Sequence, residues 1–446
     1  MKGSRKRFVL IILILVSIML LYSVLKHYHI NWFDDQAVVI RTNDCDAYFD
    51  NIPALGADQE FLTNEDQVIL GSNQLAFSHL VHEQATILEA FLSIYFRPNN
   101  FHCIHVDKKA KPAFKAAVRN IVKCYKKKVK HGSIFILPES ESFSVEWGKN
   151  NMLKADLSCI RKLLQMKQDD GSTAWSQSIS VAGNELPIVS YSSLYNKIHQ
   201  HLGSDLSSVE SFILPMNDSF RISEMQNTDR KISKDGIQED NTYEIPNPLI
   251  SLSKSESSKS SLDQKNIQFK VFKGARNVIL SSKDADFIVN HQVAKVMLDW
   301  FSLGSFTEEH FYSTVIRFRV DNNDMVSQNI SAKEVRKNSA EITFTSGDTL
   351  HGICPRYADW GCKNCFGQCY RTLCHFHSLD LVKIDEDSTE CLIANKFNLN
   401  VDPLAVSQQW MKVLRKSVIG VIKDEEKIQL YFLNNVVKKI HMLIMN

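Results

Sequence analysis

The sequence predicts an α/β fold, built on a mostly parallel sheet with helices on both faces. Between residues 74 and 182, apolar runs of strand length alternate with longer stretches whose apolar residues recur at helical spacing. This alternation is the pattern of parallel sheets covered on both sides. The composition, 44% hydrophobic and 23% charged, is that of a globular domain. A net charge of +2 indicates no polyanionic partner, so nucleic acid is not expected to bind.

The first unit of this pattern runs from residue 75 to residue 107. Residues 75–81 have the length and composition of a buried strand. A helix is expected over residues 87–95, and Pro98 follows as a stop signal. Residues 101–106 are expected as the second strand, which ends at Asp107. Ligands of such sheets bind beyond the carboxyl ends of strands, which makes Asp107 a candidate site residue.

The alternation then continues toward residue 182. Residues 134–137 are expected as a third strand, the apolar stripe between Leu153 and Leu164 as a helix, and residues 179–182 as another strand. The sequence contains no internal repeat and no Pro/Gly-rich hinge. We therefore expect one large domain, residues 74–446, in place of two smaller ones.

A polar stretch at residues 222–268 interrupts the pattern. Seven of the eleven residues from 251 to 261 are serine, which is typical of a mobile surface insertion. After it, residues 278–280 predict a strand, and Ser282 is expected to cap a helix that runs from about residue 283 to residue 301. A shorter helix is expected to start near Thr307.

The first 25 residues predict a membrane anchor. Residues 8–25 are an uninterrupted apolar run of 18 residues, which as a helix covers roughly 27 Å, the thickness of a thin bilayer. Four basic residues precede the run and should hold the N-terminus in the cytosol: Lys2, Arg5, Lys6 and Arg7. A cleaved signal peptide is the alternative, but the run is long for one and no small-residue cleavage site follows it.

This topology places nearly all of the chain in the secretory pathway. The expected segments are a cytoplasmic tail at residues 1–7, a transmembrane signal anchor at 8–25, a stem at 26–73 and the lumenal domain at 74–446. In a lumenal domain, ten cysteines are expected to form disulfides. The sequons at Asn217 and Asn329 are expected to carry N-linked glycans.

Motifs of several enzyme classes are absent from the sequence. It has no Gly-rich phosphate loop, no Gly-x-Ser-x-Gly and no His-Glu-x-x-His, which argues against dehydrogenases, P-loop enzymes, hydrolases and zincins. The Asp-x-Asp pattern that many sugar-nucleotide transferases use for a metal occurs three times, a number expected by chance. None follows a strand in the nucleotide-binding half, so each is interpreted as a solvated acidic pair: Asp44 with Asp46, Asp284 with Asp286, and Asp385 with Asp387.

Five sequence blocks, in order, resemble the core 2/I-branching β-1,6-N-acetylglucosaminyltransferases, glycosyltransferase family 14. The similarity covers roughly residues 74–408. The blocks are IYFRPNNFHCIHVD at 94–107, Trp147 with ADLSC at 155–159, GNELP at 183–187, FTEEH at 306–310 and LIANKF at 392–397.

This resemblance implies a GT-A-type fold and a Golgi enzyme that takes UDP-GlcNAc as donor, inverts the anomeric carbon, branches O-glycans and needs no metal. It places Glu309 on the family's catalytic base, which would accept the proton of an acceptor hydroxyl. Arg371 and Lys396 fall on the two cations that hold the donor's diphosphate and replace a metal. Asp107 falls on a residue of the uridine pocket.

The sequence departs from the family in two of the five blocks. The family usually has Pro-Asp-Glu where this chain has Thr307-Glu308-Glu309, and Asp where this chain has Glu185. Glu309 also has a structural interpretation, because it follows a potential N-cap, Thr307, where the helix dipole favours a carboxylate.

Cysteines cluster between residues 354 and 391. With His375 and His377 nearby, Cys362, Cys365, Cys369 and Cys374 could form a zinc site, although their spacings fit no common zinc motif and disulfides are expected instead. The resemblance implies the pairs Cys103–Cys159, Cys45–Cys124 and Cys365–Cys374. The pairing of four cysteines stays open: Cys354, Cys362, Cys369 and Cys391.

Two other functions are kept beside the first. A protein O-xylosyltransferase shares the fold, but the short chain without a further C-terminal domain argues against it. A catalytically inactive relative that binds a glycan or a partner is the second alternative, and the sequence does not identify the acceptor.

Overall fold

The computed structural model describes residues 35–50, 74–128, 133–213, 242–246, 266–321, 349–350, 353–387 and 391–419. Within these residues no helix is long and apolar enough to cross a membrane. The predicted anchor at residues 8–25 and both sequon asparagines, Asn217 and Asn329, lie outside them.

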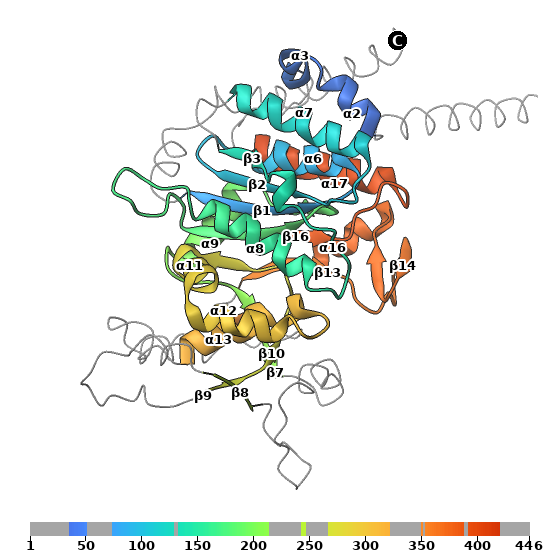
Figure 1. The fold of residues 1–446 in the computed structure, drawn as a ribbon. Helices are drawn as coiled ribbons and strands as arrows, with labels where there is room; N and C mark the ends of the chain where they lie inside the picture. The colour runs from blue at the N-terminus through green and yellow to red at the C-terminus, as the bar shows by residue number, and fades with distance from the viewer. Residues whose placement is uncertain are drawn as a thin grey trace, which may run out of the picture.

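The centre of the molecule is a five-stranded sheet in the order β11-β4-β1-β2-β3 (Figure 1). The first four strands of the sequence pattern are parallel and the fifth is antiparallel. The prediction of a mostly parallel sheet is therefore confirmed. The strands are β1 (Leu75–Val81), β2 (Phe101–Val106), β3 (Ile134–Ile136), β4 (Gln177–Ala182) and β11 (Ile279–Ser281).

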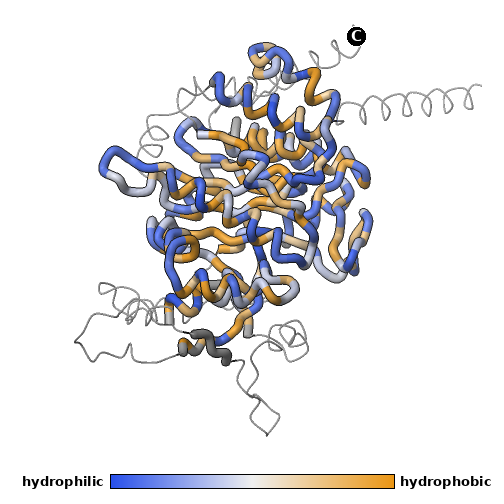
Figure 2. Tube along the Cα trace, viewed as in Figure 1, coloured by the Kyte–Doolittle hydropathy of each residue, from blue (hydrophilic) through white to orange (hydrophobic). Residues whose placement is uncertain are grey.

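Helices cover both faces of this sheet because the side chains of each strand alternate between the faces. On one face, Ala76 and Cys103 pack in a cluster with α8 (Asn151–Leu163). On the other, apolar side chains of β1, β2 and β4 pack against three helices: α6 (Ala85–Tyr95), α7 (Pro112–Lys128) and α9 (Tyr191–Leu202). Figure 2 shows hydrophobic residues concentrated along the central strands, between the two helix layers.

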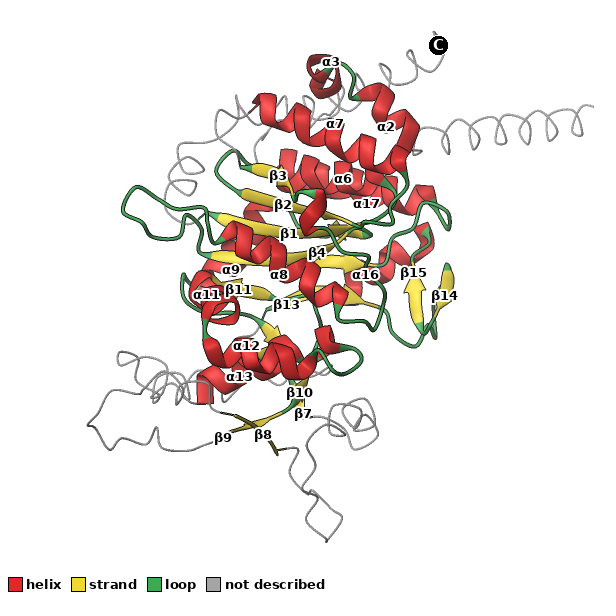
Figure 3. Ribbon diagram, viewed as in Figure 1, coloured by secondary structure: helices red, strands yellow, loops and turns green. Residues whose placement is uncertain are grey.

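A second, three-stranded sheet joins distant parts of the chain. Its order is β13-β16-β5, with β13 (Cys354–Ala358) parallel to β16 (Cys391–Asn395) and β5 (Glu185–Pro187) antiparallel to β16. Beside it, the hairpin of β14 (Gln368–Tyr370) and β15 (Leu373–His375) lies at the periphery of the molecule (Figure 3). This sheet positions the segment that follows β16, where Lys396 lies.

The helix predicted over residues 283–301 is two helices, α11 (Ser282–Asn290) and α12 (Gln292–Phe301). The chain breaks at His291, whose extended backbone ends α11 and whose Nδ1 accepts a hydrogen bond from Val293 N at 3.3 Å to cap α12. The predicted cap is also wrong by one residue, because the hydroxyl that accepts from Asp284 N, at 3.1 Å, belongs to Ser281.

The prediction of Thr307 as a helix cap is wrong as well. Thr307 is the first residue of a 3-10 turn, η5 (Thr307–Glu309), and Phe306 precedes it in the left-handed conformation with φ 57°. The helix that follows, α13 (Phe311–Asp321), begins only after this turn. Glu309 is therefore held in a tight turn, and a capping role at Thr307 does not account for it.

Two strands overlap the stretch predicted as a polar insertion. β8 (Thr242–Pro246) pairs antiparallel with β9 (Asn266–Lys270), and Ile267 and Phe269 of β9 are buried in the core that contains α12 and α13. The rest of residues 222–268 lies outside the described residues.

All ten cysteines form disulfides in the structure. Three bridges are those that the family resemblance implies: Cys45–Cys124, Cys103–Cys159 and Cys365–Cys374. The four cysteines left open pair as Cys354–Cys391 and Cys362–Cys369. The zinc interpretation is therefore wrong, since the sulfurs it needs are bonded to one another.

Candidate active site

Asp107 lies at the carboxyl end of β2, where it is 5% exposed. Its Oδ1 accepts a hydrogen bond from Lys109 N at 2.7 Å, and its Oδ2 accepts one from Val145 N at 3.1 Å. The carboxylate thus fastens residues 143–148, which we call the central loop, to the edge of the sheet. His105 adds a second attachment, because its Nε2 accepts a hydrogen bond from Phe143 N at 2.9 Å.

The turn that carries Glu309 rests on the other end of the central loop. Phe306 N donates to Gly148 O at 3.0 Å, and Gly274 N donates to Glu309 O at 2.7 Å. Gly274 is required at its position, since a Cβ there would lie 1.9 Å from Glu210 O. The backbone of Glu309 is therefore fixed from two sides, while its side chain remains partly exposed.

Glu308 differs strongly from its neighbour. It is 3% exposed, and its Oε2 has no hydrogen-bond partner among the described residues. Burial, together with the nearby charge of Glu309, raises the pKa of Glu308 to about 7. Two adjacent carboxyl groups thus have different environments, and Glu309 is the one that is partly exposed to solvent.

A buried polar network lies close to Glu308. Arg276, 8% exposed, pairs with the fully buried Asp156 at 3.9 Å, and its positive charge partly offsets the rise in the pKa of Glu308. The charge of Asp156 is further satisfied by three hydroxyl donors, Ser78 Oγ at 2.5 Å, Ser180 Oγ at 2.9 Å and Tyr312 Oη at 2.9 Å. This network ties the sheet to α13, directly behind the acidic turn.

Glu185, where the family usually has Asp, is 1% exposed and joins the two sheets. Its carboxylate accepts hydrogen bonds from Ala182 N at 2.8 Å, Asn277 Nδ2 at 2.8 Å and Asn395 Nδ2 at 3.2 Å. It also pairs with Arg356 at 3.7 Å. Because Asn395 immediately precedes Lys396, this network positions the backbone that carries Lys396.

The two cations come from different elements, which a backbone hydrogen bond from Phe376 N to Lys396 O, 2.9 Å long, connects. Arg371 is at the tip of the β14–β15 hairpin with φ 50°, and its Cζ lies 4.9 Å from the ring of Trp147. Lys396 follows β16. Burial lowers the pKa of Lys396; the charge of Glu83 opposes this shift and that of Arg371 adds to it. Two neighbouring cations of this kind are suited to hold an anionic group between them.

The central loop connects the candidate residues. Asp107 holds it through Val145, Arg371 lies over the ring of Trp147, and the Glu309 turn is attached through Gly148. The rings of Trp147 and Phe306 also meet edge to face, with centroids 4.6 Å apart. The structure thus gathers the acid turn, one cation and the strand-end aspartate around a single loop.

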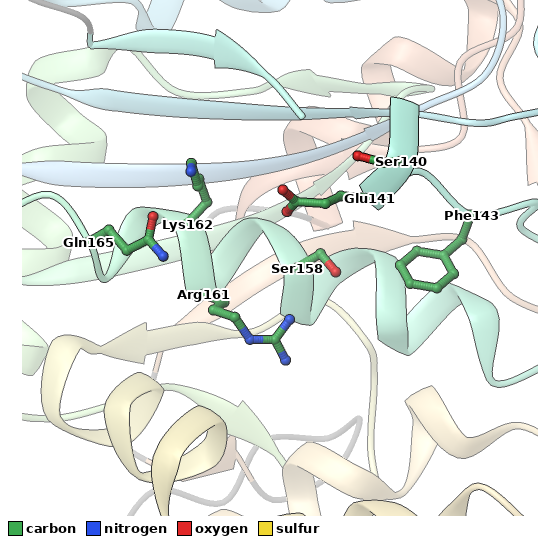
Figure 4. A pocket seen from close by; sticks show the side chains of 7 residues that line it. All are labelled: Ser140, Glu141, Phe143, Ser158, Arg161, Lys162 and Gln165. Carbon is green, nitrogen blue, oxygen red and sulfur yellow. The ribbon is translucent and has the colours of Figure 1, made fainter. Parts of the chain in front are cut away.

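A separate surface hollow of about 430 Å³ lies between the 3-10 turn η1 (Glu139–Glu141) and α8 (Figure 4). None of Asp107, Glu309, Arg371 and Lys396 lines it, so it is not the candidate site. Its lining residues are Ser140, Glu141, Phe143, Ser158, Arg161, Lys162 and Gln165.

The interpretation of the Asp-x-Asp motifs as solvated pairs is wrong for Asp284. This residue is 8% exposed, accepts hydrogen bonds from Ser207 and Ser281, and pairs with Arg319. Across the described ranges, the one close grouping of metal-ligand residues is Cys365, Cys374 and Asp380, in which the two sulfurs form a disulfide.

The sequence matches the family model described as Core-2/I-Branching enzyme over residues 75–385. The mouse β-1,3-galactosyl-O-glycosyl-glycoprotein β-1,6-N-acetylglucosaminyltransferase 4 is 24% identical over 371 residues, which are 83% of this chain and 70% of that protein. The human protein named probable β-1,3-galactosyl-O-glycosyl-glycoprotein β-1,6-N-acetylglucosaminyltransferase 7 is 23% identical over 379 residues, which are 83% of this chain and 76% of that protein. The human N-acetyllactosaminide β-1,6-N-acetylglucosaminyl-transferase is 22% identical over 332 residues, which are 74% of this chain and 70% of that protein.

The α/β fold and these matches define the chain as a glycosyltransferase. It belongs to the Core-2/I-Branching enzyme family, whose model covers most of the chain.

Proposed function

We propose that the protein transfers N-acetylglucosamine from UDP-GlcNAc to a hydroxyl group of an O-glycan, forming a β-1,6 branch with inversion and without a metal. The names of its relatives support the donor sugar and the linkage. The observation that carries the proposal is the central loop, around which an accessible carboxylate, a strand-end aspartate and a cation are gathered.

In this proposal Glu309 is the general base. It accepts the proton of the acceptor hydroxyl while that oxygen attacks C1 of the sugar and the bond from C1 to the β-phosphate oxygen breaks. Two backbone hydrogen bonds fix the main chain of the turn that carries it, which limits the positions that the carboxylate can take. Glu308, behind it, is 3% exposed and does not reach the acceptor.

Arg371 and Lys396 bind the diphosphate and stabilise the negative charge that develops on the leaving UDP. Asp107 lies beside the uridine, at the strand end where nucleotides of open α/β sheets bind. A GT-A-type fold with this cation pair needs no divalent ion in the site. In support, Asp284, the buried acid of the second Asp-x-Asp motif, is already neutralised by Arg319.

The setting that we propose for this activity is the Golgi membrane. Residues 8–25 anchor the protein as a type II membrane protein, and the transferase domain is lumenal. Asn217 and Asn329 then carry N-linked glycans, and enzymatic deglycosylation of the protein from secretory cells should increase its gel mobility. An unchanged band would contradict the lumenal placement of both sites.

A donor screen tests the proposal. The purified full chain in detergent is incubated with a β-1,3-galactosyl-N-acetylgalactosamine acceptor and a panel of UDP-sugars. UDP-GlcNAc should be the donor that gives product. Transfer of xylose to serine peptides would instead identify a protein O-xylosyltransferase. If no UDP-sugar is transferred or hydrolysed, the chain is an inactive, glycan-binding or partner-binding relative.

A further inference from the structure

A row of exposed side chains crosses the disulfide-bonded hairpin beside the candidate site. Leu373 pairs with Tyr370 on one neighbouring strand and with Trp360 on the other. Residues directly opposite each other in antiparallel strands place their side chains on the same face. The three side chains therefore share a face, which we call the aromatic row, and Trp360 is 61% exposed and Tyr370 52% exposed.

The segment that presents the aromatic row is rigid. The bridges Cys362–Cys369 and Cys365–Cys374 close it from both sides. The carboxylate of Asp380 holds its turns, accepting hydrogen bonds from Phe366 N at 2.9 Å, Gly367 N at 3.1 Å and His377 N at 2.8 Å. Because the aromatic rings are held by a fixed backbone, little conformational entropy is lost when a ligand packs on them.

The aromatic row is continuous with the candidate active site. The ring of Tyr370 lies 5.3 Å from Cζ of Arg371, which lies 4.9 Å from the ring of Trp147. Trp147, itself 55% exposed, contacts Phe306, the residue before the Glu309 turn. A line of exposed rings therefore leads from the acid turn to the hairpin.

The chemistry of this surface fits a carbohydrate chain. A pyranose ring has an apolar C–H face that packs on an aromatic ring, while its hydroxyl groups bond to polar neighbours such as Gln368, two residues from Tyr370 on the same face. Trp360 and Tyr370 are two inter-strand steps apart, about 10 Å. This distance is too large for one uracil to pack on both rings, whereas two sugars of one chain can. Two rings are too small an area for a stable protein interface, which needs roughly 800 Å² on each partner.

We propose that the aromatic row binds sugar residues of the acceptor glycan beyond the one that receives the new branch. This inference rests on the proposed function, because it assigns an outer part of the same acceptor. It predicts that the enzyme prefers extended O-glycans to the minimal disaccharide, and that Trp360 and Tyr370 create this preference.

The test compares KM for three substrates in wild type, Trp360→Ala and Tyr370→Ala. Either variant should raise KM about 3- to 10-fold for an O-glycan extended by N-acetyllactosamine. In Trp360→Ala, KM should not change for β-1,3-galactosyl-N-acetylgalactosamine or for UDP-GlcNAc; Tyr370→Ala is compared on the glycans alone, because the ring of Tyr370 lies 5.3 Å from Cζ of Arg371. Trp360→Phe should retain most of the affinity. Val382→Ala, an exposed apolar position at 63% on α16 (Leu381–Asp387), is the matched control and should change nothing.

Saturation-transfer NMR with the same glycans on the full chain separates this inference from the proposed function, because it requires no turnover. Loss of the extended-glycan signal in Trp360→Ala supports the aromatic row even if no transfer is ever detected. Unchanged KM and NMR signals in both alanine variants of an active enzyme would overturn the inference and leave the transferase proposal standing. A rise in KM for UDP-GlcNAc alone in Trp360→Ala would show that the rings serve the nucleotide, and would also overturn it.

Discussion

At the scale of single residues, two acids that adjoin in the sequence have separate environments. Glu308 is buried with a pKa raised to about 7, whereas Glu309 is partly exposed on a turn fixed through Gly274 and Gly148. The family resemblance singles out Glu309 by its place in a block. The burial of Glu308 could not be predicted from the sequence, because it depends on the contact between the turn and the distant central loop.

Substitution of the two acids by glutamine should therefore have unequal effects. Glu309→Gln keeps the size of the side chain but removes the base, so transfer should fall about 10²- to 10⁴-fold with UDP binding nearly intact. Glu308→Gln resembles the neutral acid, so its rate of transfer should stay within a few fold of the wild-type rate at a pH below the pKa of about 7. Steady-state kinetics and UDP titration measure both. A fully active Glu309→Gln with an inactive Glu308→Gln would reverse the assignment.

Buried histidines should make the fold sensitive to acid. His79 and His102 lie face to face in the core, with Nε2 and Nδ1 3.1 Å apart. Burial lowers the pKa of His79 to about 3, below the value near 6.5 of an unfolded chain. The unfolded state therefore binds an extra proton between these values, and the free energy of unfolding should fall as pH drops from about 6.5 toward about 3.

Denaturant unfolding at several pH values tests this dependence. Each such histidine contributes a slope of up to about 1.4 kcal/mol per pH unit. His79→Gln should flatten the curve, whereas His82→Gln, at a half-exposed loop position, should not. Parallel curves for wild type and His79→Gln would contradict the account.

At the scale of elements, the strands β1 to β4 and the helices α6 and α8 could be predicted because each is a local pattern of apolar residues. The helix α7 (Pro112–Lys128) was missed. The break between α11 and α12 could not be predicted, since it depends on a backbone cap that His291 provides. The hairpin that presents Arg371 has little periodicity and is shaped by disulfides. The position of this hairpin beside the central loop depends on the whole fold.

Gly274 is the element-scale position on which the acid turn depends. Gly274→Ala would place a methyl group 1.9 Å from Glu210 O and 2.2 Å from Ser313 Oγ. The chain must move, so we expect a loss of about 1–3 kcal/mol in stability and a lower kcat. Gly203→Ala, at φ +55° with open space around it, is the control. It should cost stability without lowering kcat, and an equal fall in kcat would contradict the role of Gly274 in positioning Glu309.

At the scale of the whole molecule, residues far apart in the sequence assemble around the central loop. Asp107, Glu309 and Arg371 each approach it from a different element. Lys396 is linked to the end of the hairpin that carries Arg371, because Phe376 N donates a hydrogen bond to Lys396 O at 2.9 Å. These four residues are predicted as site residues by the resemblance of the sequence to its family. The supporting pair of Arg276 and Asp156 could not be predicted from the sequence, because only the folded chain brings the two side chains together behind the turn.

We propose that Arg371 and Lys396 replace a metal at the diphosphate. The most direct measurement is GlcNAc transfer and UDP affinity of wild type, Arg371→Ala and Lys396→Ala, each with and without EDTA, with Lys363→Ala as a matched surface control. EDTA should leave the wild-type activity unchanged. Each site variant should have a higher KM for UDP-GlcNAc and a lower kcat, because the cations bind both the ground state and the developing charge. Lys363→Ala should resemble wild type. Wild-type activity that EDTA abolishes and Mn²⁺ restores, or full activity in both site variants, would contradict the claim.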